Sequence, residues 1–113
     1  MSIIEMDYQN KLKIYDDLVA QCSRFKRLGK TMPYTSANGY MFSLFNKAGE
    51  IGIRFSKEVQ DHYIKKFDTT VYHSYGAVMR GYILIPEHLW NDEKTIVNLL
   101  NESYDYVMSL KTK

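Results

Sequence analysis

The sequence has few residues of the kinds that crosslink a chain. Cys22 is the single cysteine among 113 residues. One cysteine excludes an internal disulfide and a cysteine-rich zinc site, and this usage fits a reducing compartment. No apolar run approaches the ~20 residues that span a bilayer, and no secretory signal pattern opens the chain. We therefore expect a cytoplasmic protein with no membrane partner.

The sequence also lacks a strong excess of charge of one sign. It has 15 Lys and Arg against 13 Asp and Glu, a net charge of +2. Proteins that live on nucleic acid usually carry a clear basic surplus or stripe, so the overall charge argues against that partner. With 45% hydrophobic and 25% charged residues, the chain belongs to the globular class. Its length predicts one domain, residues 1–113.

Apolar periodicity predicts a first helix. Apolar side chains recur at spacings of three and four over residues 12–25, which is typical of an amphipathic helix. Ser2 and Glu5 match a capping box, and Asp7 is an alternative start. Gly29 suits the position just after the end of this helix.

The middle of the chain predicts a β-hairpin followed by a helix. After a short edge strand at residues 31–34 and a turn at 35–39, strands are expected at residues 40–45 and 51–55, joined by a turn. Ser56 is a good N-cap for a helix that reaches about Phe67.

The last part of the chain predicts a second hairpin and a closing helix. Short strands are expected at residues 71–73 and 78–85, and the helix is capped by Asn91 or Asp92. Its buried stripe is Ile96, Leu100, Tyr104, Val107 and Met108. The fold class that follows is α+β, an antiparallel sheet of four or five strands packed against the N- and C-terminal helices.

Three segments carry a family resemblance. They are Gly39-Tyr40-Met41-Phe42-Ser43-Leu44, Gly52-Ile53-Arg54-Phe55 and the strand at 78–86. They resemble the N-terminal domain of the TfoX (Sxy) family, small bacterial α+β domains linked to regulation of competence. The resemblance spans roughly residues 30–110 and implies that fold and a regulatory role beside a partner. The family's Met-Phe-Gly-Gly segment is replaced by Met32-Pro33-Tyr34-Thr35, and the second domain of full-length TfoX proteins has no counterpart.

Catalytic and metal-binding signals are weak. Cys22 lies on the apolar stripe and is interpreted as a small buried side chain. His62, His73 and His88 show no metal-ligand spacing. No Gly-x-Ser-x-Gly, phosphate loop or His-Glu-x-x-His occurs. We expect no cofactor, no metal and no enzymatic activity.

Two sets of residues are candidates for binding. Tyrosine is abundant, with ten in the chain, and is common at interfaces. One exposed sheet face for an anionic or planar partner would comprise Tyr34, Arg54, Arg80 and Tyr82. A phosphate-contacting patch would comprise Arg24, Lys26, Arg27 and Lys30, although these cations equally suit the C-terminal end of a helix.

Three functions stay open from the sequence. The first is a non-enzymatic regulatory module that acts through protein contacts, as a homodimer or with an unidentified protein. The second is a nucleic-acid-associated protein that uses the basic patch. The third is a small-molecule site or enzyme around Tyr34, Arg54 and Tyr82.

Overall fold

The computed structural model describes residues 6–112 and has the α+β class that the sequence predicts. Its elements are, in order, α1 (Tyr8–Ala20), β1 (Tyr34–Ala37), β2 (Tyr40–Phe45), β3 (Ile51–Arg54), α2 (Lys57–Lys66), β4 (Val71–Ser74), β5 (Ala77–Leu84), the 3-10 helix η2 (Glu87–Leu89) and α3 (Glu93–Met108). Both predicted hairpins form, as β2–β3 and β4–β5. Ser56 and Asp92 cap α2 and α3 through their side chains, as expected.

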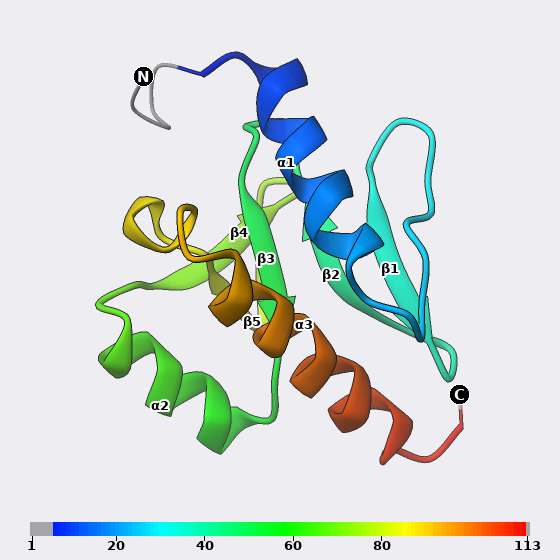
Figure 1. The fold of residues 1–113 in the computed structure, drawn as a ribbon. Coiled ribbons are helices and arrows are strands. Elements are labelled where there is room, and N and C mark those ends of the chain that lie inside the picture. Colours follow the sequence, from blue (N-terminus) through cyan, green and yellow to red (C-terminus); the bar gives the residue numbers. More distant parts are fainter. Residues whose placement is uncertain (1–5, 113) are drawn as a thin grey trace.

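The five strands form one antiparallel sheet in the order β1-β2-β3-β5-β4. The helices α1 and α3 cross one face of it, with α2 beside β5 (Figure 1). The main core lies between these helices and the sheet. Its fully buried members include Tyr15, Leu18, Phe42, Phe45, Ile53, Ile83, Ile96 and Leu100.

A β-bulge gives β2 an additional side chain that faces this core. Thr35 pairs with Ser43 and Ser36 with Met41, so Phe42 is an extra residue in β2. The Phe42 ring packs edge-on against Phe25, while the Ser43 hydroxyl bonds the Tyr15 hydroxyl at 2.7 Å. Two consecutive residues therefore face the helices, because a bulge interrupts the alternation of a strand.

A second, smaller apolar cluster lies on the opposite face of the sheet. Its buried members Leu44 and Tyr82 alternate along their strands with residues of the main core. Tyr72 joins them from β4 and donates its hydroxyl to the carbonyl oxygens of Leu44 and Glu50, at 3.1 and 2.9 Å. Partly buried neighbours complete the cluster: Met32, Tyr34, Met41, Met79 and Leu84.

The first helix is shorter than its periodicity predicts. Asp7 is its N-cap, accepting from the Asn10 N–H at 2.8 Å, and α1 ends at Ala20. Ser2 and Glu5 lie outside the described residues. The predicted helix over residues 21–28 is wrong, since that segment folds back as a loop.

Tertiary contacts explain this early end. Leu28 and Tyr34 exchange backbone hydrogen bonds at 2.8 and 3.0 Å, so the loop is tied to β1 rather than continuing α1. Gly29 has φ +85° within that loop and does not follow a helix end. Phe25 is buried as its spacing indicates, but from the loop. Periodicity here identified burial correctly and conformation incorrectly.

Two further boundaries differ from expectation. The edge strand covers Tyr34–Ala37, so only Asn38 and Gly39 remain of the turn predicted at residues 35–39. In α3, Met108 is 48% exposed although the predicted stripe buries it. Val107, its neighbour in the last turn, is fully buried, so the buried side of the helix there includes Val107 and not Met108.

Candidate functional site

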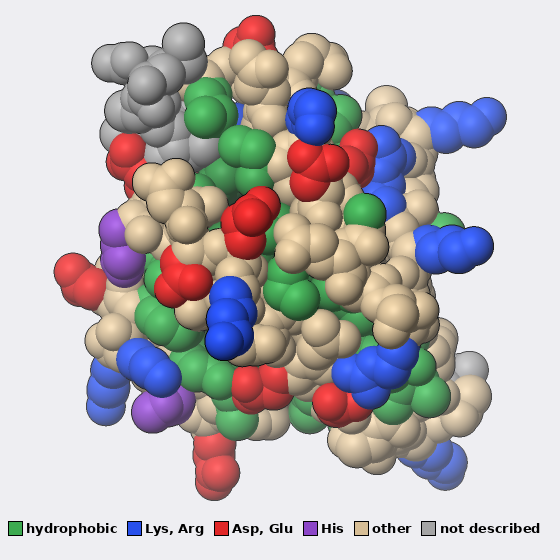
Figure 2. Space-filling view, in the orientation of Figure 1, with side chains coloured by type: hydrophobic (Ala, Val, Ile, Leu, Met, Phe, Trp, Pro, Cys, Tyr) green, Lys and Arg blue, Asp and Glu red, His purple; other side chains and the backbone are tan. Residues whose placement is uncertain are grey.

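The predicted basic patch is partly neutralised by acidic neighbours. Arg24 Nη1 lies 2.7 Å from Asp105 Oδ1, and this hydrogen bond lowers the pKa of the Asp105 carboxyl. Arg27 forms a two-pronged bond with Asp16, at 2.8 and 3.2 Å. Basic and acidic side chains are interspersed over the helix-covered face (Figure 2).

The two lysines of the patch are less engaged than its arginines. Both Lys26 and Lys30 are exposed and form no ion pair with a carboxylate of residues 6–112. Two of the four cations of the patch, the lysines, could therefore contact a phosphate without first breaking an ion pair. Its arginines hold the loop after α1 against α1 and α3 instead.

The predicted sheet-face residues separate into two pairs. Tyr82 is 4% exposed and donates its hydroxyl to the Met41 carbonyl at 2.9 Å, and Tyr34 packs in the same apolar cluster. The Tyr82 ring is therefore buried, and the Tyr34 ring is partly covered by the same cluster. Arg54 and Arg80, in contrast, come together at the rim of the sheet.

These two arginines line a cavity of about 330 Å³, named here the arginine pocket. Arg54 comes from the end of β3, Arg80 and Gly81 from β5, and Tyr106 from α3. The remaining lining residues, Phe55, Lys57 and Gln60, belong to the start of α2 and the residues before it. Gln60 fixes α2 to β5, since its Nε2 donates to the Tyr82 carbonyl at 3.0 Å.

A bulge in β5 shapes this pocket. Val71 pairs with Ile83 and His73 with Val78, so β5 carries several more residues than β4 over this stretch. Gly81 lies in this stretch with φ +84°, in the left-handed region, and a Cβ there would stand 3.0 Å from the Phe55 carbonyl oxygen. Glycine tolerates this backbone conformation at low cost. The bulge thus brings Arg80 to the same pocket as Arg54.

The charge of the arginine pocket is not compensated. Neither Arg54 nor Arg80 forms an ion pair with a carboxylate of residues 6–112. Arg54 is held instead over the rings of Tyr40 and Tyr106, 5.4 and 5.8 Å from their centroids. The third cation, Lys57, has a partner: its Nζ lies 2.8 Å from Asp61 Oδ1.

The positive field of Arg54 also acts on its cross-strand neighbour. Burial raises the pKa of Tyr82 above its ordinary value, and the Arg54 charge opposes that rise. A guanidinium presents planar N–H donors that match a carboxylate or a phosphate, often through two bonds at once. Two such groups at one cavity can bind a single anionic group.

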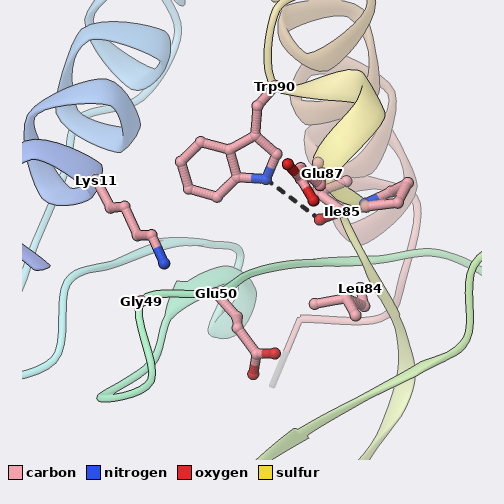
Figure 3. Close-up of a pocket in the computed structure, with 8 residues that line it drawn as sticks. Lys11, Gly49, Glu50, Leu84, Ile85, Glu87 and Trp90 are labelled. Carbon is pink, nitrogen blue, oxygen red and sulfur yellow. Dashed lines mark hydrogen bonds between the residues drawn. The ribbon is translucent and has the colours of Figure 1, made fainter. Parts of the chain in front are cut away.

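A second cavity lies between α1, the β2–β3 turn and η2 (Figure 3). Its volume is about 160 Å³, and Trp90 forms part of its wall, with Nε1 donating to the Ile85 carbonyl at 3.3 Å. Lys11 extends toward it, and its lining also includes Glu50 and Glu87. Because its lining has charges of both signs, this cavity does not favour a ligand of one charge as the arginine pocket does.

The surroundings of Cys22 and of the possible metal ligands do not favour chemistry there. Cys22 is buried beyond the end of α1, where burial raises the pKa of its thiol and Sγ donates to the Leu18 carbonyl. A raised pKa disfavours the nucleophilic thiolate. Over residues 6–112, His, Cys, Asp and Glu side chains form no group of three that suits a metal ion.

Sequence reasoning identified both arginines but missed the pocket around them. Gln60, Gly81 and Tyr106 were not predicted to be neighbours. An isolated glycine inside a strand pattern signals a bulge, and Gly81 between Arg80 and Tyr82 fits that signal. No signal in the sequence relates α3 to the end of β3.

Comparison with known proteins assigns no family to this chain. No family model matches it, and no curated protein matches it. Within the described part of the chain, no helix combines the length and apolarity needed to cross a membrane. The TfoX resemblance therefore stays a prediction.

Proposed function

We propose that this protein is a non-enzymatic binding module whose arginine pocket holds an anionic side chain of a partner protein. The regulatory role implied by the TfoX resemblance is the setting in which such a module would act. The group recognised is a carboxylate or a phosphorylated side chain, which share the chemistry that a guanidinium binds.

One contrast within the chain carries this proposal. Of its four arginines, Arg24 and Arg27 are paired with aspartates, whereas Arg54 and Arg80 line a cavity and have no carboxylate partner among residues 6–112. Like charges brought together repel, and an anion between them turns repulsion into attraction. The Tyr40 and Tyr106 rings already restrain the Arg54 side chain, so it loses less conformational entropy when it binds an anion.

The size of the site favours a protein side chain over a nucleic-acid strand. Affinity for nucleic acid depends on neutralising many phosphates along a track. The arginine pocket is one cavity of about 330 Å³. The predicted track, the Arg24–Lys30 segment, has both its arginines already paired.

The first test is an NMR titration with inorganic phosphate and with acetate, followed through the arginine Nε–H resonances. Arg54 and Arg80 are expected to shift in a saturable manner. Arg24 and Arg27 serve as internal controls, because carboxylates already occupy their donors. Shifts that are equal at all four arginines would show general ionic screening and contradict the proposal.

The second test links the pocket to a partner. Proteins captured from lysate by the wild type are compared with those captured by Arg54→Gln/Arg80→Gln and by the control Arg24→Gln/Arg27→Gln. A nuclease-resistant partner lost only from the first variant is the expected result. The contrary result is a set of partners that is lost after nuclease treatment and that the control variant also fails to capture at ~50 mM salt. That result would mean that the protein binds nucleic acid through the basic patch.

A further inference from the structure

We propose that a third cavity is a separate binding site for a small ligand with a planar apolar body and an acidic group. This turn pocket lies where the β2–β3 turn, the β4–β5 turn and the segment before β1 meet. Its volume of about 460 Å³ exceeds the 330 Å³ of the arginine pocket. Its lining includes Met32, Asn46, Lys47, Ala48, Ser74 and Tyr75.

The first observation is a buried hydroxyl without a partner. Ser74 is 6% exposed, and its Oγ has no hydrogen-bond partner within residues 6–112. An unsatisfied buried polar group is costly, so native proteins rarely keep one without a reason. Ser74 belongs to the wall of the turn pocket. A polar ligand atom that enters there would supply the missing partner.

The second observation is a strained aromatic residue. Tyr75 has φ +55° and is 72% exposed, beside Gly76 with φ +73°. The turn from β1 to β2 has the same left-handed geometry, with φ 56° at Asn38. Asparagine suits that conformation, whereas a tyrosine is an outlier there.

The two turns also differ in what their side chains do. The amide of Asn38 donates to the Val107 and Leu110 carbonyls at 2.9 and 2.8 Å, which ties the turn to the end of α3. The Tyr75 side chain makes no such hydrogen bond to residues 6–112, and the residue is largely exposed. Strain without a structural return is typical of ligand-binding positions.

The lining chemistry indicates the class of ligand. Tyr75 and Met32 offer a ring and a polarizable thioether, which suit a flat apolar body. Lys47 lies at the same cavity, is exposed and forms no ion pair with a carboxylate of the described chain, residues 6–112. An acidic group on the ligand would meet this ammonium.

A matched pair of fluorescent probes tests both parts of this ligand class. Anilinonaphthalene sulfonate has an aromatic body and an anionic group, and N-phenylnaphthylamine has a similar body without charge. We expect saturable one-to-one binding of the sulfonate and weaker binding of the neutral probe. Lys47→Met should weaken the sulfonate about fivefold and leave the neutral probe unchanged.

Two further variants locate the site. Tyr75→Asn relieves the turn strain, so the protein stays folded, while loss of the ring should weaken both probes about fivefold. Ala48→Trp fills the cavity from an exposed position and should abolish binding. Ala20→Trp, at an exposed position on α1, is the control and should leave binding intact.

The outcome is distinguishable from that of the proposed function. Arg54→Gln/Arg80→Gln should bind both probes as the wild type does, because the arginine pocket is a different cavity. Sulfonate binding that is lost in that variant but kept in Ala48→Trp would overturn the turn pocket and support the arginine pocket. Absence of saturable binding by the wild type would overturn the turn pocket alone.

Discussion

The ring of Tyr72 fills the space in which a side chain on residue 52 would stand. A Cβ added to Gly52 would collide with the Cγ, Cδ2 and Cε2 atoms of that ring. Tyr72 belongs to β4 and Gly52 to β3, and β5 lies between these strands in the sheet. The sheet therefore curls strongly enough for an edge strand to cover the face of a central one.

Gly52→Ala is expected to destabilise the protein by about 1–3 kcal/mol, because overpacking forces the Tyr72 ring to move. Chemical denaturation of both proteins measures this free energy of unfolding. In a Tyr72→Val background the same glycine substitution should cost much less, since the obstructing ring is gone. Equal costs in both backgrounds would contradict the contact.

Much of the fold follows from local sequence signals. The Asn38-Gly39 turn, the cap at Ser56 and the alternation over residues 51–55 each specify their element without help from distant residues. The end of α1 does not follow in this way. It depends on the Leu28–Tyr34 backbone pairing, a contact that only the folded chain makes.

The sites were less predictable than the fold. Arg54 and Arg80 were identified as partner-binding candidates, but their grouping with Tyr34 and Tyr82 assumed a flat, open sheet. Curling of the sheet buries Tyr82, and the Gly81 bulge redirects Arg80. The turn pocket was not predicted at all, because it joins two turns and the segment before β1, which are distant in sequence.

Alkaline pH should unfold the protein. Burial is the main cause that raises the pKa of Tyr15, Tyr72 and Tyr82 above the ordinary 10.0, and it raises that of Tyr63 to about 12. Their contribution to stability is complete below about pH 10 and is lost as pH rises toward the folded-state values. Each such group adds up to about 1.4 kcal/mol per pH unit to the decline.

Denaturation midpoints across this range, with tyrosinate absorbance, test that expectation. Tyr72→Phe removes one of the titrating groups, so its stability should decline less steeply above about pH 10. At neutral pH this variant should be less stable by about 1 kcal/mol, because two carbonyls lose a donor. A stability that is flat up to pH 11 in both proteins would be incompatible with buried, protonated tyrosines.

The orientation of α3 can be tested at two positions of its predicted stripe. Leu100 is 1% exposed and belongs to the main core, so Leu100→Ala should cost about 2–5 kcal/mol. Met108 is 48% exposed, and Met108→Ala should change stability by less than about 0.5 kcal/mol. Similar costs at both positions would mean that Met108 packs against the core as its neighbour Val107 does.

Ser74→Ala should stabilise the unliganded protein by about 1 kcal/mol, because it removes a buried hydroxyl that has no partner in the described part of the chain. Ser43→Ala is the matched control. Ser43 is fully buried and its hydroxyl bonds Tyr15 Oη and Thr35 Oγ1 at 2.7 and 2.6 Å. That substitution should destabilise by about 1–3 kcal/mol, since it leaves those partners unsatisfied.

If the two Ser→Ala substitutions change the free energy of unfolding in opposite directions, the Ser43 hydroxyl stabilises the fold and the Ser74 hydroxyl does not. If Ser74→Ala destabilises as Ser43→Ala does, the Ser74 hydroxyl has a partner in solution, such as an ordered water. It would then give no support to the turn pocket. A stabilising effect would mean that the Ser74 hydroxyl lowers the stability of the unliganded protein, as expected of a group that hydrogen-bonds only to a ligand.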